Sequence, residues 1–404
     1  MLKAREESLW RGRNFRLAWL GQTTSNIGTG LLQLAVLLFV YARTHSVSLT
    51  TLTFLVETVP VMLISPFAGV LADRIDRRRL AIAADAMNAL VLVPLLFSHR
   101  LDVLLPVLAL QAAISSVFRP AFGALFPLLV PADRLTQANG VTTATWSVLG
   151  LVVPSLGAAL FATFGFGLVV AIDLATFAVS ILMTSATRPR PVESASGPLT
   201  AVSTVRAEFA AGVRLIARTP RIRVLVITGL VLGCAEGLLM PVFVPFMQGT
   251  LGATTKQVGF AASAQSVGGI AGGLLVALVA RRLRASTMYI WGSAGMTAGI
   301  LAVGVAPSYL AAVVALMFLG IPSTFFQVGD TTLIQTQVPP EFLGRAMGTV
   351  GALSAMVVAL AGATPLALVP LIGVRGVVIV GGLAAAASSI TAASKLRRAY
   401  VSQP

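Results

Sequence analysis

The chain has 404 residues, of which 56% are hydrophobic and only 11% are charged, and its formal net charge is +15. Soluble domains carry roughly 25% charged residues, and the mean hydropathy of +0.90 lies far from that class. The charges stand between long apolar segments, which excludes a soluble protein and favours a membrane protein over a nucleic-acid-binding one.

Charge-poor runs along the chain predict twelve membrane-spanning helices, because each run is long enough to cross a hydrocarbon core. The least distinct boundaries lie at 164–167 and 372–376, where glycines are typical of tight turns. We therefore expect an all-α membrane protein with spans at residues 17–42, 48–72, 80–98, 101–125, 138–162, 164–186, 223–248, 257–280, 285–306, 309–330, 343–370 and 372–394.

Basic residues are divided unequally between the two sets of predicted loops. If the N-terminus is inside, the outside loops hold only Arg43, Arg100, Lys256 and Arg375, and all other basic runs are inside. Cytoplasmic loops attract Lys and Arg, so the pattern predicts that both termini are cytoplasmic. This distribution of basic residues, together with the abundance of Arg, Ala and Gly, favours location of the protein in a bacterial cytoplasmic membrane.

The second half of the chain repeats the first. Residues 116–140 align without gaps with residues 324–348, and residues 71–76 align with 279–284 at the same spacing. The repeat predicts a six-helix bundle over 1–186 and another over 223–404. Parallel repeats of this kind occur in transporters, whose substrate site lies near mid-membrane.

The segment 187–222 joins the two predicted bundles. It begins as a Pro/Ser/Gly-rich linker and continues as an amphipathic helix with Val205, Phe209, Val213 and Ile216 on one face. Such a helix can lie on an anionic membrane surface, or it can be a basic connector.

The stretch GVLADRIDRRRL, residues 69–80, resembles the signature of the major facilitator superfamily between spans two and three. This resemblance implies the superfamily fold, two six-helix bundles related by pseudo-symmetry. It also implies a conformational switch formed by Gly69, Asp73, Arg74, Arg77, Arg78 and the span-four Arg119. One position departs from the signature, since Asp76 stands where the family has a second glycine.

Stretches in spans one, four, six and ten resemble the drug-efflux branch, which includes macrolide-efflux-like and enterobactin-exporter-like proteins, with lysophospholipid transporters as similar relatives. The branch often has an acidic residue after the sequence SNIG, where this chain has Thr29.

Among the carboxylates within the predicted spans, Glu57, Asp85, Asp173 and Glu236 are the candidates for binding protons or substrate, and Asp330 lies at the inner end of the tenth span. A charged side chain at membrane depth costs at least about 2.5–3.5 kcal/mol, so such residues are candidates for function. An isolated carboxylate in a medium of low dielectric takes up a proton near neutral pH, and it also attracts a cation. Structural explanations remain open, such as pairing of Asp85 with loop arginines.

Uncharged polar residues in the spans are candidates for lining a cavity, although they can also bond between helices. They are Gln22, Asn26, Gln33, Gln111, Gln265 and Gln327. No metal-ligand cluster and no phosphate-binding loop occurs in the sequence, so we expect neither an enzyme, nor a cofactor, nor a bound metal.

These observations predict a monomeric secondary active transporter that works by alternating access in the lipid bilayer. Its first expected activity is proton-coupled export of amphiphilic or cationic small molecules such as drugs. Alternatives are a lipid or lysophospholipid transporter or flippase without proton coupling, which the absence of an acid at Thr29 favours, and a siderophore exporter. A membrane scaffold with no transport activity is a further alternative.

Overall fold

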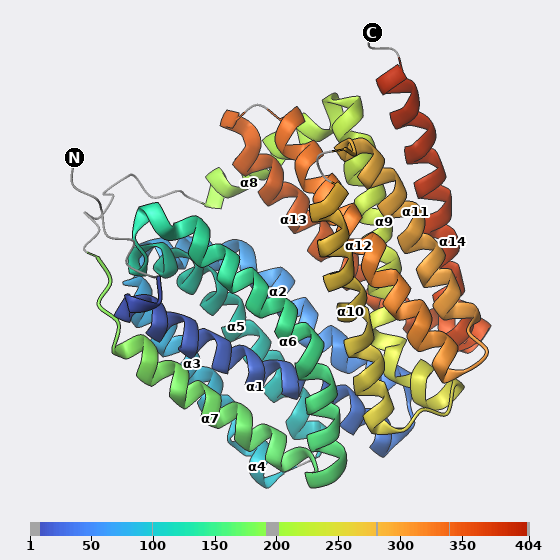
Figure 1. Ribbon diagram of the computed structural model, residues 1–404. Coiled ribbons are helices and arrows are strands. Elements are labelled where there is room, and N and C mark those ends of the chain that lie inside the picture. The colour runs from blue at the N-terminus through green and yellow to red at the C-terminus, as the bar shows by residue number, and fades with distance from the viewer. Residues whose placement is uncertain (1–8, 99, 191–201, 280–281, 339, 402–404) are drawn as a thin grey trace, which may run out of the picture. The chain divides into compact units, whose positions relative to one another are not determined.

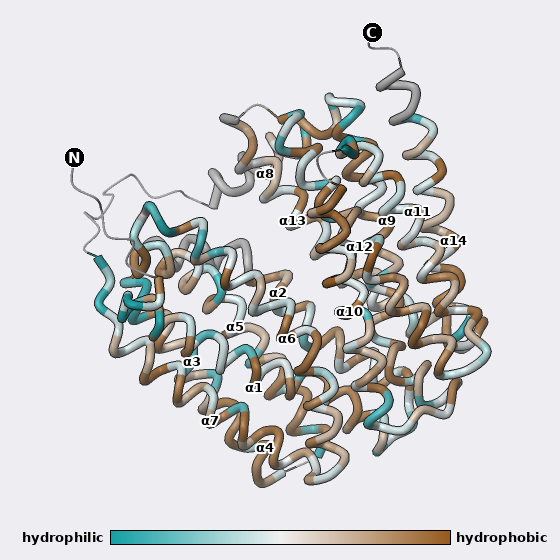
Figure 2. The backbone as a smooth tube through the Cα atoms, in the orientation of Figure 1, coloured by the Kyte–Doolittle hydropathy of each residue, from teal (hydrophilic) through white to brown (hydrophobic). Residues whose placement is uncertain are grey.

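The computed structural model describes residues 9–98, 100–190, 202–279, 282–338 and 340–401, without the side chains of 65–74 and of a few other positions. The described residues are almost all helical (Figure 1). Twelve helices are long and apolar enough to cross a membrane, which confirms the predicted all-α membrane protein. Hydrophilic segments gather at the helix ends (Figure 2).

The chain divides into two compact units. The first comprises residues 1–36 and 56–200, and the second comprises 37–55 and 201–404. Segment 37–55 contains the end of α1 and the beginning of α2 and belongs to the second unit. The helices of the first half are η1 (Leu9–Arg11), α1 (Arg13–Thr44), α2 (Val47–Arg74), α3 (Arg77–Leu92), α4 (Pro94–Phe97), α5 (Leu101–Leu129), η2 (Ala132–Arg134), α6 (Leu135–Phe164) and α7 (Phe166–Ser185).

The second half begins with α8 (Val202–Arg218), whose presence the amphipathic pattern predicts. Ile216 is buried against Ile222 and Val226, whereas Phe209 and Val213 are each 38% exposed. The predicted apolar face is therefore only partly buried; the side chain of Val205 lies outside the described residues. After it come α9 (Pro220–Pro245), the π-turn η3 (Phe246–Thr250), α10 (Thr255–Val279), α11 (Ala285–Val305), α12 (Tyr309–Gln337), α13 (Pro340–Ala363) and α14 (Pro365–Val401).

Helix boundaries repeat between the halves at the 208-residue spacing seen in the sequence. Helices α5 (Leu101–Leu129) and α12 (Tyr309–Gln337) begin and end 208 residues apart. Gly165 and Gly373 are also 208 residues apart, and their φ values of 82° and 70° are both in the left-handed region that favours glycine. The local backbone therefore supports the internal duplication.

One predicted span is too long. The apolar run predicts a helix to residue 370, but α13 ends at Ala363 and a new helix begins at Pro365. Proline disfavours helical geometry in the residue before it, which explains the break at Thr364. The turn expected at 372–376 is present, because Gly373 interrupts α14 with φ 70° and ψ 170°.

Within the N-terminal unit, α7 lies beside α1 and α3 (Figure 1). Gly28 of α1 packs directly on Asp173 and Thr176 of α7, where an added Cβ would lie 3.0 Å from the Asp173 Cα. Small residues let membrane helices approach closely. This contact sets α1 closely against α7.

Candidate functional site

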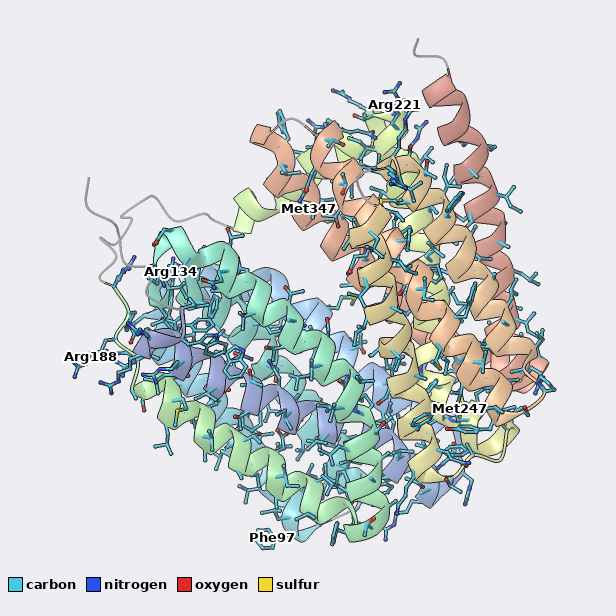
Figure 3. The ribbon with its side chains drawn as sticks, in the orientation of Figure 1. Phe97, Arg134, Arg188, Arg221, Met247 and Met347 are labelled. Carbon is cyan, nitrogen blue, oxygen red and sulfur yellow. The ribbon has the colours of Figure 1, made fainter. Side chains whose placement is uncertain are left out.

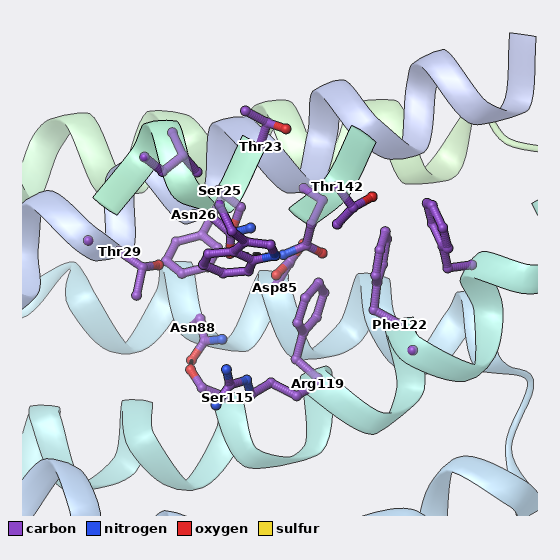
Figure 4. A pocket seen from close by; sticks show the side chains of 18 of the residues that line it. Thr23, Ser25, Asn26, Thr29, Asp85, Asn88, Ser115, Arg119, Phe122 and Thr142 are labelled. Atoms are coloured by element: carbon purple, nitrogen blue, oxygen red, sulfur yellow. Dashed lines mark hydrogen bonds between the residues drawn. The ribbon is translucent and has the colours of Figure 1, made fainter. Parts of the chain in front are cut away.

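A cavity of about 830 Å³ lies within the N-terminal unit (Figure 4). Its walls come from α1, α2, α3, α5, α6 and α7 of that unit. Ligand cavities in proteins measure roughly 300–1,000 Å³, so this one can hold a small organic molecule.

One wall of the cavity is a polar face of α1. Gln22, Asn26, Thr29 and Gln33 recur at helical spacing and all line the cavity. The Gln22 amide donates a hydrogen bond to Asn26 Oδ1 at 3.0 Å, which orders that part of the wall.

The facing wall comes from α3 and α5. Asp85 and Asn88 lie one turn apart on α3, and the Ser115 hydroxyl of α5 donates to Asn88 Oδ1 at 3.4 Å. Arg119 stands one turn further along α5 and extends toward Ser115 and Asn88 (Figure 4). Arg119 is exposed and lines the cavity, and no hydrogen bond or ion pair joins it to the described part of the chain.

Two carboxylates line the cavity and a third lies behind its wall. Glu57 of α2 is half-buried, and Asp85 is 1% exposed. The Ser180 hydroxyl of α7 donates to Asp85 Oδ2 at 2.6 Å. Asp85 thus bonds a neighbouring helix, and it pairs with no arginine among the described side chains.

Asp173 of α7 is fully buried and does not line the cavity. Thr29 and Thr176 donate hydrogen bonds to its Oδ1 at 3.4 and 3.3 Å, and Oδ2 has no partner. A carboxylate therefore does lie beside Thr29, but it comes from α7 rather than from α1. The sequence departure at Thr29 does not leave this position without an acid.

Aromatic rings give the cavity apolar surface. Phe118, Phe122 and Phe126 follow one face of α5, with ring centroids 5.6 and 6.2 Å apart in succession. Trp19 and Trp146 line the same cavity, and the Trp19 indole donates to Thr145 Oγ1 at 2.9 Å. The cavity is thus amphiphilic, because its lining includes aromatic rings as well as carboxylates and amides.

The structure brings together most of the residues predicted from the sequence. Seven of them line the cavity: Gln22, Asn26, Gln33, Glu57, Asp85, Gln111 and Arg119. Glu236, Gln265 and Gln327 belong to the C-terminal unit and do not line it. Glu236 lies near the middle of its predicted span and is exposed in the structure.

Asn88, Ser115 and the aromatic residues belong to the site, although the sequence patterns did not predict them. Helical spacing could have found some of them, because Ser115 falls midway between Gln111 and Arg119 on one face of α5. Spacing alone could not show whether that face of α5 points toward the cavity or toward a neighbouring helix.

The signature loop is visible only in part. Gly69, Asp73 and Arg74 lie on the helical backbone of α2, but their side chains lie outside the described residues. Asp76 has φ −50° and accepts a hydrogen bond from the Arg79 amide at 2.8 Å. It is therefore the N-cap of α3, and this conformation does not require the family's glycine.

Arg77 and Arg78 connect the start of α3 to the ends of other helices. Arg78 donates to the carbonyl oxygens of Thr184 and Ser185 at the C-terminus of α7. Arg77 donates to the Ala124 carbonyl of α5 at 3.4 Å. Helix C-termini favour cations, so these arginines hold one end of the N-terminal unit together.

The twelve helices, the repeated halves and the amphiphilic cavity define an integral, multi-pass membrane protein with a small-molecule cavity among its spanning helices. The chain belongs to the Major Facilitator Superfamily, whose sequence model matches residues 18–235 and 225–403.

Its relatives include exporters. The chain is 24% identical over 352 residues to macrolide efflux protein A of Streptococcus pyogenes, covering 85% of this chain and 86% of that protein. It is 26% identical over 348 residues to enterobactin exporter EntS of Escherichia coli, covering 83% and 80%. The solved structure of a bacterial homologue of the iron transporter ferroportin, in an inward-facing state, matches with a TM-score of 0.72 at 17% identity, covering 96% and 100%. The chain is a transporter and not an enzyme.

Proposed function

We propose that this transporter exports amphiphilic, cationic small molecules from the cytoplasm by alternating access in a bacterial cytoplasmic membrane, in exchange for protons. The observation that carries the proposal is the cavity of the N-terminal unit. Its phenylalanines and tryptophans suit an apolar body, and Glu57 and Asp85 attract a positive charge. The efflux relatives support the direction of transport.

The test is uptake of tetraphenylphosphonium, a lipophilic cation, into everted membrane vesicles under an imposed pH gradient. We expect uptake that stops when an ionophore collapses the gradient, and slower uptake for Asp85→Asn. The matched control is Asp102→Asn, because Asp102 is an exposed acid that pairs with Arg100 and does not line the cavity. Uptake that does not depend on the pH gradient would contradict proton coupling. Transport of labelled lysolipid without transport of tetraphenylphosphonium would support the lipid alternative.

Binding can be measured separately from transport by intrinsic fluorescence. Trp19 and Trp146 line the cavity, and Trp146 is 49% exposed. We expect a bound cation to quench this emission and Trp146→Phe to lose a large part of the quench. Quenching unchanged by that substitution would place the ligand elsewhere.

Siderophore export is a second candidate, favoured by one observation. Arg119 is the only cation among the described residues that line the cavity, and it pairs with none of them. A guanidinium binds carboxylate or other oxyanionic groups, and one relative is named an enterobactin exporter. If enterobactin, but not tetraphenylphosphonium, is transported and Arg119→Gln abolishes its binding, this candidate replaces the first.

A further inference from the structure

Two tryptophans line the cavity of the N-terminal unit, and the structure supports them differently. Trp19 belongs to α1 and Trp146 to α6. Trp19 is half-buried, whereas Trp146 is 49% exposed. Both residues can offer an indole ring to a ligand, but only one of the two rings is fixed by its neighbours.

The indole of Trp19 is tied to α6 by a hydrogen bond. Its Nε1 donates to Thr145 Oγ1 at 2.9 Å. The Thr145 hydroxyl has a single hydrogen, which it donates to the Val141 carbonyl oxygen at 2.8 Å. The Thr145 oxygen therefore acts as an acceptor, and it restrains the ring of Trp19 from the other end of the unit's sequence.

A second contact comes from η1, the short helix that precedes α1. Leu9 is 3% exposed and lies in a buried cluster with Phe15 and Val130, which anchors η1. The neighbouring Trp10 makes an edge-to-face contact with Trp19, with ring centroids 5.0 Å apart and ring planes at 89°. Aromatic pairs favour this geometry. Trp10 does not itself line the cavity, so it acts on the cavity only through Trp19.

Trp146 has no comparable support. In the part of the chain that the structure describes, its indole makes no hydrogen bond and no ring contact. It can therefore change rotamer at small cost. A ring that is already held in place loses less conformational entropy when a ligand stacks on it than a ring that must first be ordered.

We infer that Trp19 is the specificity-determining ring of this cavity, and that Thr145 and Trp10 are positioning residues that hold it ready for the flat face of a ligand. Stacking on a fixed indole favours a flat aromatic ligand over an aliphatic one of the same charge. Trp146 adapts to ligands of either shape. The inference rests on the proposed function for the charge of the ligand, but the support of Trp19 does not depend on it.

The experiment is isothermal titration calorimetry of the purified full-length protein with two monovalent cations. N-methylacridinium is flat and aromatic, and tetrabutylammonium is aliphatic. We expect the native protein to prefer N-methylacridinium, and Trp19→Leu to lower the ratio of the two affinities by roughly 3- to 10-fold, as for the loss of one aromatic contact. Trp146→Leu is expected to weaken both cations alike.

The positioning residues are tested by pairs of variants. We expect Thr145→Val, which keeps the shape but not the acceptor, to lower the same ratio, and Thr145→Ser to restore it. The matched control is Thr142→Val, because Thr142 also lines the cavity but donates only to the Ala138 carbonyl oxygen of its own helix. Trp10→Leu is expected to lower the ratio, and Trp10→Phe, which keeps a ring, to retain most of it.

Ultraviolet resonance Raman spectroscopy checks the hydrogen bond without any ligand, because an indole vibration reports whether the N–H donates. We expect Thr145→Val to remove the signal of one hydrogen-bonded indole, and Thr142→Val to leave the spectrum unchanged. An unchanged spectrum in Thr145→Val, or an affinity ratio that is equal in the native protein, Trp19→Leu and Thr145→Val, overturns the inference.

A third ligand separates this inference from the proposed function. If acridine, which is flat but uncharged at neutral pH, binds as well as N-methylacridinium and with the same dependence on Thr145, the proposed preference for cations fails and the role of Trp19 stands. If no flat aromatic ligand binds, the inference is overturned, whereas uptake of tetrabutylammonium into vesicles would leave the proposed function standing.

Discussion

At the scale of single residues, Asp76 departs from the family pattern and has a local structural role. The signature has a glycine at this place, but α3 begins at Arg77 and needs a partner for its first amide groups. The Asp76 carboxylate accepts from the Arg79 amide, and its charge suits the positive end of the helix. The residue is therefore explained by capping and not by turn geometry.

We predict that Asp76→Ala lowers the stability of the N-terminal unit by about 1 kcal/mol, because replacing an N-cap by alanine costs roughly that amount. Asp76→Gly is expected to cost only a few tenths of a kcal/mol. The measurement is the midpoint of thermal unfolding in detergent, with Asp76→Ser as the control that keeps a cap. Equal midpoints for Ala and Ser would contradict the capping role.

At the scale of elements, the contact between α1 and α7 positions the wall of the cavity that α1 forms. Gly28 has no room for a side chain, because Asp173 and Thr176 lie against it. The same contact lets Thr29, on the cavity side, reach the buried Asp173. The sequence predicts that Gln22, Asn26 and Gln33 of α1 can line a cavity, but it does not predict that Thr29 bonds to Asp173, which lies 144 positions away.

We predict that Gly28→Ala destabilises the protein by about 1–3 kcal/mol, the usual cost of overpacking a close contact. It is also expected to disturb the environment of Asp173. Gly140→Ala is the matched control, because nothing lies within 4 Å of an added Cβ there, and alanine improves helix propensity by up to about 1 kcal/mol. Thermal unfolding of the two variants decides the matter: equal stability would mean that α1 and α7 can separate at no cost.

At the scale of the whole molecule, the duplication and the charge distribution determine the topology. In the N-terminal unit, Arg134 and Arg188 lie at one end and Phe97 at the other (Figure 3). In the C-terminal unit, Arg221 and Met347 lie at the end opposite Met247 (Figure 3). Within each unit separately, this arrangement agrees with the positive-inside pattern of the sequence.

We predict that Arg188→Cys reacts with a membrane-impermeant maleimide only after cells are permeabilised, and that Phe97→Cys reacts in intact cells. Both variants are made with Cys234→Ser, which removes the single native cysteine. Phe97 is 84% exposed, so its position is open to reagent. Labelling of position 188 in intact cells would reverse the orientation.

The amino-acid sequence by itself determined the class of protein, the twelve spans, the two-fold repeat and the superfamily. These follow from apolar run length, charge placement and a loop signature, which are all local properties of the chain. Only the tertiary structure decided which polar residues meet. Gln22, Glu57, Asp85 and Arg119 line one cavity, whereas Asp173 of the same unit does not, because the rotation and packing of the helices set which side chains face the cavity. A hydropathy pattern shows where a residue lies along the length of a span. It does not show which side of the helix faces a cavity, and function depends on both.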